Sequence, residues 1–221
     1  MLMDTLIATR TRPSMLPEST TPVPGWGPVH TAGDASLLTR AGVAIIGSRR
    51  SSHEGREAAA TIATHLANAG LVIISGLAAG IDAVAHEAAM AAGGRTIAVI
   101  GTSLDKAYPK DHAALQARIA TEHLVVSPFD SGAPTAAWHF PKRNRLMAQL
   151  AHATVLIEAS ATSGTRHQVA ACATLGRPIL APAHLVEQLD WLKTASVRPH
   201  VHVWREPSDI VRLLAQRLAM S

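Results

Sequence analysis

Residues 43–52 read Val-Ala-Ile-Ile-Gly-Ser-Arg-Arg-Ser-Ser, a short apolar run followed at once by small and basic residues. Comparable apolar runs recur along the chain at 71–74, 96–100, 124–126, 154–157 and 178–180, with Val201-His-Val203 as a seventh candidate. None of these runs alternates apolar with polar residues, a pattern typical of strands that are covered on both faces of a parallel sheet.

Amphipathic segments lie between these runs. In residues 53–69, for example, Ala59, Ile62 and Ala63 repeat at helical spacing. Further helices are expected at 81–92, 111–121, 143–151, 163–175, 185–195 and 207–220. Strands regularly separated by helices imply right-handed βαβ units and an open, mostly parallel α/β sheet with helices on both faces. Ligands of such sheets bind beyond the carboxyl ends of the strands, so a functional site is expected at that edge.

Residues 1–28 differ from the rest because five prolines interrupt them, at positions 13, 17, 22, 24 and 28. Proline fixes φ and removes a backbone donor. This segment is therefore expected to be an extended arm, or a loosely packed lead-in that wraps onto the domain through Leu16 and Trp26. Residues 29–221 are expected to form a single domain.

The composition excludes several classes of protein. The 221 residues carry a formal net charge of +4, which permits an anionic partner without requiring one. The single cysteine, Cys172, excludes an internal disulfide and a cysteine-based zinc site. No apolar run approaches the ~20 residues of a membrane span, so a cytoplasmic protein without a membrane partner is expected. The sequence contains neither a Gly-x-Gly-x-x-Gly run nor a Walker lysine, and its histidines are scattered, so no cofactor or metal is expected.

Four loops of small residues follow strands and precede helices. Their candidate anion-binding residues are Gly47, Ser48, Arg49 and Arg50; Ser75, Gly76 and Gly80; Gly101 and Thr102; and Ser163, Gly164 and Thr165. Backbone N–H groups in such loops can approach a phosphate, and the N-terminus of the following helix favours an anion. The convergence of four loops at one sheet edge indicates a ligand the size of a phosphate or nucleotide.

The segment 138–145, Trp-His-Phe-Pro-Lys-Arg-Asn-Arg, combines two aromatic rings with three cations. Cations neutralise phosphates, and the faces of aromatic rings stack on bases. Phe140, Lys142, Arg143, Asn144 and Arg145 are therefore candidate ligand contacts. The alternative is a solvated basic helix start whose aromatic rings pack in the core.

Asp82 and His86 lie one helical turn apart, directly after the second glycine-containing loop. The favoured interpretation is that Asp82 caps the helix and His86 packs inside the domain. A catalytic Asp–His pair is the alternative, although no nucleophile lies near it in the sequence.

Together these residues resemble the DNA-processing protein A family, also called Smf. The matching segments are 43–49, 75–86, 94–102, Leu104-Asp105 with Tyr108-Pro109, 140–145, and Glu158 with Ser163-Gly164, and Gly33-Asp34 with Leu37-Leu38 is similar to the family's lead-in. The resemblance covers roughly residues 29–182. It implies an extended Rossmann-like fold that binds single-stranded DNA, forms homodimers and loads a RecA-type recombinase, with no enzymatic activity known. It further implies that the DNA pocket uses Gly47, Ser48, Arg49, Phe140, Lys142, Arg143 and Arg145.

The chain departs from the family pattern in several places. Ala79 stands where a cation is common, and Arg166-His167 replaces an apolar run. Neither a winged-helix domain nor a helical N-terminal domain is expected within these residues. Two alternatives therefore stay open: a sensor of a nucleotide or nucleotide-derived signal, and a phosphoribohydrolase-like enzyme with Glu158 as base. The loop Ala161–Thr165 lacks the glycine pattern of those hydrolases.

Overall fold

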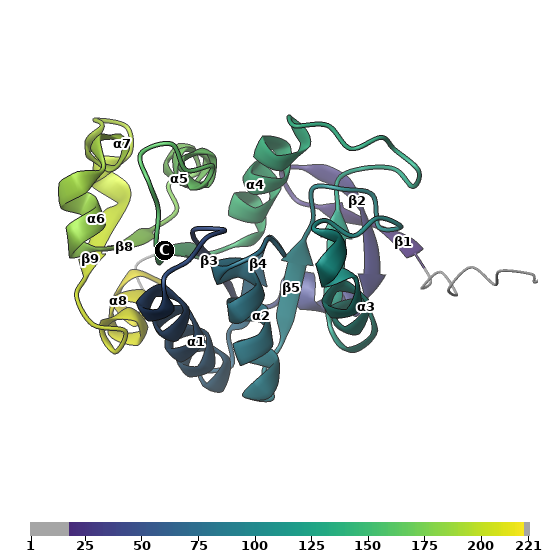
Figure 1. Cartoon of the computed structure of the whole chain (residues 1–221), viewed down its shortest axis with the longest axis horizontal. Helices are drawn as coiled ribbons and strands as arrows, with labels where there is room; N and C mark the ends of the chain where they lie inside the picture. The colour runs from purple at the N-terminus through teal and green to yellow at the C-terminus, as the bar shows by residue number, and fades with distance from the viewer. Residues whose placement is uncertain (1–17, 219–221) are drawn as a thin grey trace, which may run out of the picture.

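The computed structural model describes residues 18–218, which form one nine-stranded sheet with helices on both faces (Figure 1). Seven of these strands are parallel and occupy the positions of the apolar runs, including the seventh candidate. They are β3 (Gly42–Ile46), β4 (Val72–Ser75), β5 (Thr96–Val99), β6 (Leu124–Ser127), β7 (Ala153–Leu156), β8 (Ile179–Pro182) and β9 (Val201–Trp204). Every residue of β3 to β8 is buried, as strands without polar alternation require.

The order of the strands determines where a crevice opens. The sheet runs β1-β2-β6-β5-β4-β3-β7-β8-β9. The chain therefore builds outward from β3 in one direction through β6 and then returns to the other side of β3 with β7. The connections that leave the neighbouring strands β3 and β7 diverge, and such a switch point leaves a crevice at the carboxyl ends of the two strands.

The helices form two layers (Figure 1). Val43 and Ile45 of β3 face one core, into which pack α1 (His53–Asn68), α2 (Ile81–Ala91) and α8 (Asp209–Leu218). The helix α3 (Ala113–Glu122) covers the same face farther along. Ala44 and Ile46 face the opposite core, which is closed by α4 (His139–Leu150), α5 (Thr165–Thr174), α6 (Ala183–Gln188) and α7 (Asp190–Lys193). Three short 3₁₀ helices complete the described elements: η1 (Ala35–Thr39), η2 (Lys110–His112) and η3 (Arg198–His200).

Two of the expected helices differ from the observed ones by more than two residues at one end or in continuity. The helix α4 begins at His139 rather than at residue 143, because Pro141 lies in its first turn, where a missing backbone N–H is tolerated. The segment 185–195 is two short helices, α6 and α7, separated at Leu189.

The N-terminal part of the described chain also differs from the expectation. Strands β1 (Glu18–Val23) and β2 (Gly27–Gly33) form an antiparallel hairpin, and β2 pairs with β6 from His30 onward. Residues 18–28 therefore belong to the sheet and not to an arm, with Trp26 packed against the core. Their prolines are compatible with strands because β1 is an edge strand and Pro28 precedes the stretch that pairs with β6. The rest of the expected arm, residues 1–17, lies outside the described residues.

Candidate functional site

A cavity of about 600 Å³ lies at the switch point of the sheet. Its walls come from the loop after β3, from the segment between β7 and the start of α5, and from the first turns of α4. The lining residues are Ile46, Gly47, Ser48, Arg49, Arg50, Ala78, Asp82, Ala137, Phe140, Pro141, Arg143, Asn144, Met147, Ser160, Ser163, Gly164, Thr165, His167 and Gln168. The structure thus brings together ten of the residues singled out from the loops and the basic segment, from three separate stretches of the chain.

A smaller cavity of about 100 Å³ adjoins the larger one. It shares Arg49, Phe140 and Arg143 with its neighbour and adds Gly76, Gly101 and Tyr108. Tyr108 is 49% exposed, and its ring centroid lies 5.1 Å from that of Phe140. Tyr108 lines this cavity, although from the sequence it was expected only as part of a motif and not as a candidate contact. The feature of the sequence that points to Tyr108 is an aromatic residue that follows the carboxyl end of a parallel strand.

Five of the predicted site residues line neither cavity. Ser75 and Thr102 are buried, and their hydroxyls donate to the carbonyls of Ile45 and Lys106, at 2.6 and 2.7 Å. Gly80 has φ +81°, and a Cβ there would collide with the carbonyl oxygen of Ser48, so this glycine lets α2 approach the loop after β3. Lys142 and Arg145 are the other two.

The loop after β3 is held by a carboxylate from another strand. Ser52 caps α1, because its Oγ accepts from the N–H of Gly55 at 2.9 Å. The N–H and the Oγ of Ser52 both donate to Oε2 of Glu158, at 2.9 and 3.0 Å. Glu158 follows β7, so this contact ties together the two strands that flank the switch point. It also gives Glu158 a positioning role.

The side chains of Arg49 and Arg50 extend from this fixed loop, and both residues are exposed. The guanidinium carbon of Arg49 lies 5.4 Å from the centroid of the Phe140 ring, within the range of a cation–π contact. Across the cavity, Ser163 Oγ and Thr165 Oγ1 lie 2.8 Å apart, and Asn144 donates to the carbonyl of Gly164 at 3.3 Å. The cavity therefore has a basic wall with an aromatic ring and a wall rich in hydroxyl groups.

Arg143 differs from the other cations of its segment because it is only 5% exposed. Its Nη1 donates to the carbonyl of Gly76 and to that of Val99, the latter at 2.8 Å. A Cβ at Gly76 would occupy the position of this guanidinium, so the glycine is needed for the contact. Burial raises the pKa of the neighbouring Asp82, and the charge of Arg143 opposes that rise. Arg143 thus joins the ends of β4 and β5 beneath the cavity.

The Asp82–His86 pair is structural. His86 is fully buried, with Nδ1 2.6 Å from the hydroxyl of Thr96, and Asp82 accepts from the N–H of Ala78 at 3.3 Å. Packing of His86 is confirmed, whereas Asp82 is not the cap of α2: the N-cap is Gly80, without a side-chain hydrogen bond. Burial lowers the pKa of His86 from 6.5 to about 3, which keeps the ring neutral.

Within residues 18–218, no three His, Cys, Asp or Glu side chains are grouped so that they could hold a metal ion. None of the described helices is long and apolar enough to cross a membrane.

Comparison with known sequences gives one family. The family model described as "DNA recombination-mediator protein A" matches residues 13–211. The chain is 41% identical over 158 residues to "DNA processing protein DprA" of Streptococcus pneumoniae, an alignment that covers 71% of this chain and 56% of that protein. It is 35% identical over 156 residues to "Protein Smf" of Escherichia coli, covering 70% and 42% of the two chains. The chain therefore spans only about half the length of these relatives.

Solved structures agree with the sequence comparison. The structure of DNA processing protein A from S. pneumoniae has a TM-score of 0.74 and 35% identity, covering 84% of this chain and 66% of that one. A structure that addresses the single-stranded DNA binding mode of DNA processing protein A from Helicobacter pylori has a TM-score of 0.79 and 25% identity, covering 91% and 97%. A molybdenum cofactor carrier protein from Chlamydomonas reinhardtii, at 16% identity and a TM-score of 0.59, shares the fold alone.

Proposed function

Because this chain belongs to the DNA recombination-mediator protein A family, we propose that it binds single-stranded DNA at the cavity between β3 and β7. In this proposal the protein protects DNA and aids recombination or transformation by loading a RecA-type recombinase, and it acts in the cytoplasm as a homodimer. The similarity to the H. pylori protein, whose structure concerns its single-stranded DNA binding mode, supports the choice of ligand.

The observation that carries the proposal is the contact of exposed Arg49 with the ring of Phe140, beside exposed Arg50, in the lining of the cavity. The arginines and the loop N–H groups after β3 bind phosphates, and Phe140 supports a base. The hydroxyl groups of Ser163 and Thr165 face the same space and can hydrogen-bond to the sugar–phosphate chain. Binding without catalysis is proposed, since Glu158 and His86 are both engaged in structural contacts.

The proposal is tested by fluorescence anisotropy of a labelled oligothymidine at several salt concentrations. We expect saturable binding whose log–log dependence on salt has a slope of ~−0.7 for each neutralised phosphate, with duplex DNA competing poorly. Replacing both Arg49 and Arg50 by Ala should reduce that slope by about 1.4, the contribution of two phosphates. Arg205→Ala, which removes an exposed arginine before α8, is the matched control.

A second candidate function is a sensor of a nucleotide-derived signal. It is favoured by the volume of the cavity, about 600 Å³, which suits a single nucleotide, and by His167 in its lining. Absence of oligothymidine binding at low salt, together with a rise in melting temperature on adding mononucleotides, would replace the DNA proposal by this one.

A further inference from the structure

The first turn of α4 presents a second aromatic surface, outside both cavities. Trp138 is 60% exposed, more than any other large hydrophobic residue in the described part of the chain. Its ring lies against Phe129, with centroids 5.9 Å apart at 74°, and against His139, at 4.2 Å and 80°. An indole that is held by neighbours yet mostly exposed to solvent offers a flat apolar face to a ligand.

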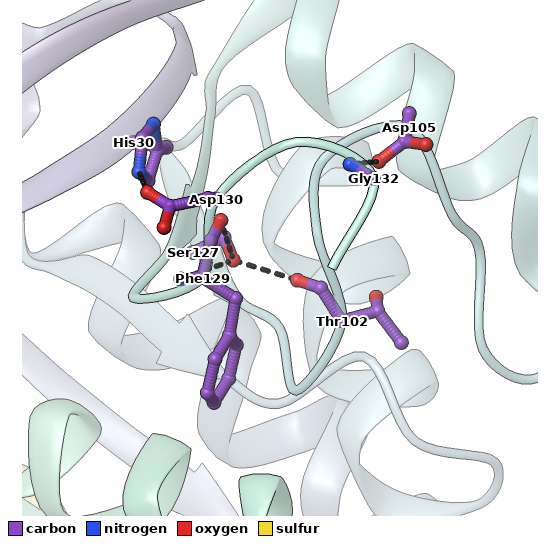
Figure 2. Close-up of polar contacts among 7 residues, drawn as sticks. All are labelled: His30, Thr102, Asp105, Ser127, Phe129, Asp130 and Gly132. Atoms are coloured by element: carbon purple, nitrogen blue, oxygen red, sulfur yellow. Dashed lines mark hydrogen bonds and ion pairs between the residues drawn. The ribbon is translucent and has the colours of Figure 1, made fainter. Parts of the chain in front are cut away.

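The support beneath this indole is fixed by the loop that follows β6 (Figure 2). Ser127 Oγ donates to the carbonyl of Thr102 at 2.6 Å and accepts from the N–H of Phe129 at 3.1 Å. Phe129, 6% exposed, stacks on His139 with centroids 3.8 Å apart and planes within 10°. The ring on which Trp138 rests is therefore held in place before any ligand arrives.

Two further contacts fasten the same loop at its outer end (Figure 2). His30 Nε2 lies 2.9 Å from Asp130, and the N–H of Gly132 donates to Asp105 at 3.3 Å. Both carboxylates of this region are thus engaged with protein groups. These contacts hold the loop that carries Phe129, and with it the support of the Trp138 ring.

A cation accompanies the exposed indole. Lys142, one turn along α4, places Nζ 5.2 Å from the Phe129 centroid and 6.0 Å from that of Trp138. The first turn of α4 contains no acidic residue. An exposed ring beside an ammonium group matches one nucleotide unit of a single strand, in which a base stacks and a phosphate is neutralised.

The exposed indole is close in sequence to residues of the main cavity. Ala137 and Phe140, on either side of Trp138 in sequence, both line that cavity. We propose that Trp138 and Lys142 form a second stacking site, outside the cavity, for another nucleotide of the same single strand. This inference rests on the proposed function, and it assigns roles to two residues that line neither cavity.

The test compares Trp138→Leu with Trp138→Phe, which retains an aromatic face, by anisotropy with long and very short oligothymidines. We expect Trp138→Leu to weaken binding of the long oligomer about 5- to 100-fold and to leave the short one, held in the cavity, nearly unchanged. Trp138→Phe should restore most of the loss. Oligothymidine should quench the tryptophan emission of the unchanged protein, and most of this quenching should be absent in Trp138→Phe although that variant binds.

The outcomes separate this inference from the proposed function. Suppose that the unchanged protein binds, that the double Arg49/Arg50 variant binds with the reduced salt slope, and that Trp138→Leu binds both oligomers normally. The proposed role of the cavity is then supported and the second site is overturned. The second site is also overturned if Trp138→Leu, with an unaltered melting temperature, loses affinity equally for the long and the short oligothymidine. A change in oligomeric state without a change in DNA binding would assign Trp138 to a protein contact instead. If the unchanged protein binds no oligothymidine, both proposals fail.

Discussion

Arg143 and Lys142 are adjacent cations of one helix with opposite surroundings. The guanidinium of Arg143 is enclosed and bonded to the carbonyls of Gly76 and Val99, whereas the ammonium of Lys142 lies over the rings of Phe129 and Trp138. In the sequence, both residues belong to one basic run, and their charge and spacing do not distinguish them. Only the packing of α4 across the ends of β4 and β5 decides which cation is buried.

This difference predicts opposite phenotypes for two single substitutions. Arg143→Ala leaves Asp82 buried without its countercharge and two carbonyls without a donor, so the free energy of unfolding should fall by about 3–5 kcal/mol. Lys142→Ala should change it by less than about 0.5 kcal/mol while reducing the salt slope of oligothymidine binding by about 0.7. Urea denaturation and anisotropy measure the two effects. Equal stability of the two variants would contradict this assignment.

At the scale of elements, the parallel strands and their helices were predictable, whereas the hairpin β1–β2 was not. Apolar runs such as 43–46 and 96–100 identify strands that are buried on both faces. Residues 18–28 contain three prolines, and they lie in a hairpin whose second strand, β2, pairs with β6 through residues 30–33. That partner strand lies about 100 positions away in the sequence, which no local pattern can report.

The position of the candidate site was predictable from the rule that ligands of open α/β sheets bind at the carboxyl ends of the strands. Loops at the carboxyl ends of parallel strands meet at one edge, so Gly47–Arg50 and Ser163–Thr165 were correctly expected to converge. The same rule also led to the expectation of Ser75 and Thr102 at the site, but neither residue lines a cavity, and their hydroxyls donate to the carbonyls of Ile45 and Lys106. The rule does not say which hydroxyls form such internal hydrogen bonds. The contact between Ser52 and Glu158 also escaped prediction, since it joins separate loops across the switch point.

That contact leads to a prediction about the loop after β3. Glu158→Ala removes both acceptor contacts to Ser52 and should lower the free energy of unfolding by about 1–2 kcal/mol. It should also weaken oligothymidine binding several-fold, because the loop carrying Arg49 and Arg50 loses its anchor. Glu158→Gln, which keeps one acceptor oxygen, should recover part of both effects.

The control for this prediction is Glu187→Ala, which removes an exposed carboxylate on α6. If Glu158 acted only through its charge, its removal would strengthen binding of an anion. Tighter binding by Glu158→Ala would therefore contradict the positioning role.

For the molecule as a whole, acid sensitivity should be dominated by one buried side chain. Thr96 Oγ1 donates to the carbonyl of Ile73, so the Nδ1–H of His86 must be the donor to Thr96. Nε2 is then the unprotonated nitrogen, and it is buried without a partner among the described residues. Protonation would place a positive charge in the core, which burial opposes most strongly, and His123, Arg143 and His112 oppose it as well, whereas a backbone hydrogen bond to Ser75 favours it.

The pKa of His86 is about 3 in the folded chain against 6.5 when exposed, so the unfolded chain binds the extra proton between these values. The contribution of neutral His86 is complete above pH 6.5 and is lost as the pH falls toward 3. At pH 5 the free energy of unfolding should be lower by about 2 kcal/mol than at pH 7.5. In urea denaturation across this range, the free energy of unfolding of His86→Asn should depend less steeply on pH than that of the unchanged protein. Some pH dependence should remain because burial also lowers the pKa of His123. His53→Asn, at an exposed position, should keep the full slope, and an unaltered slope in His86→Asn would refute the assignment.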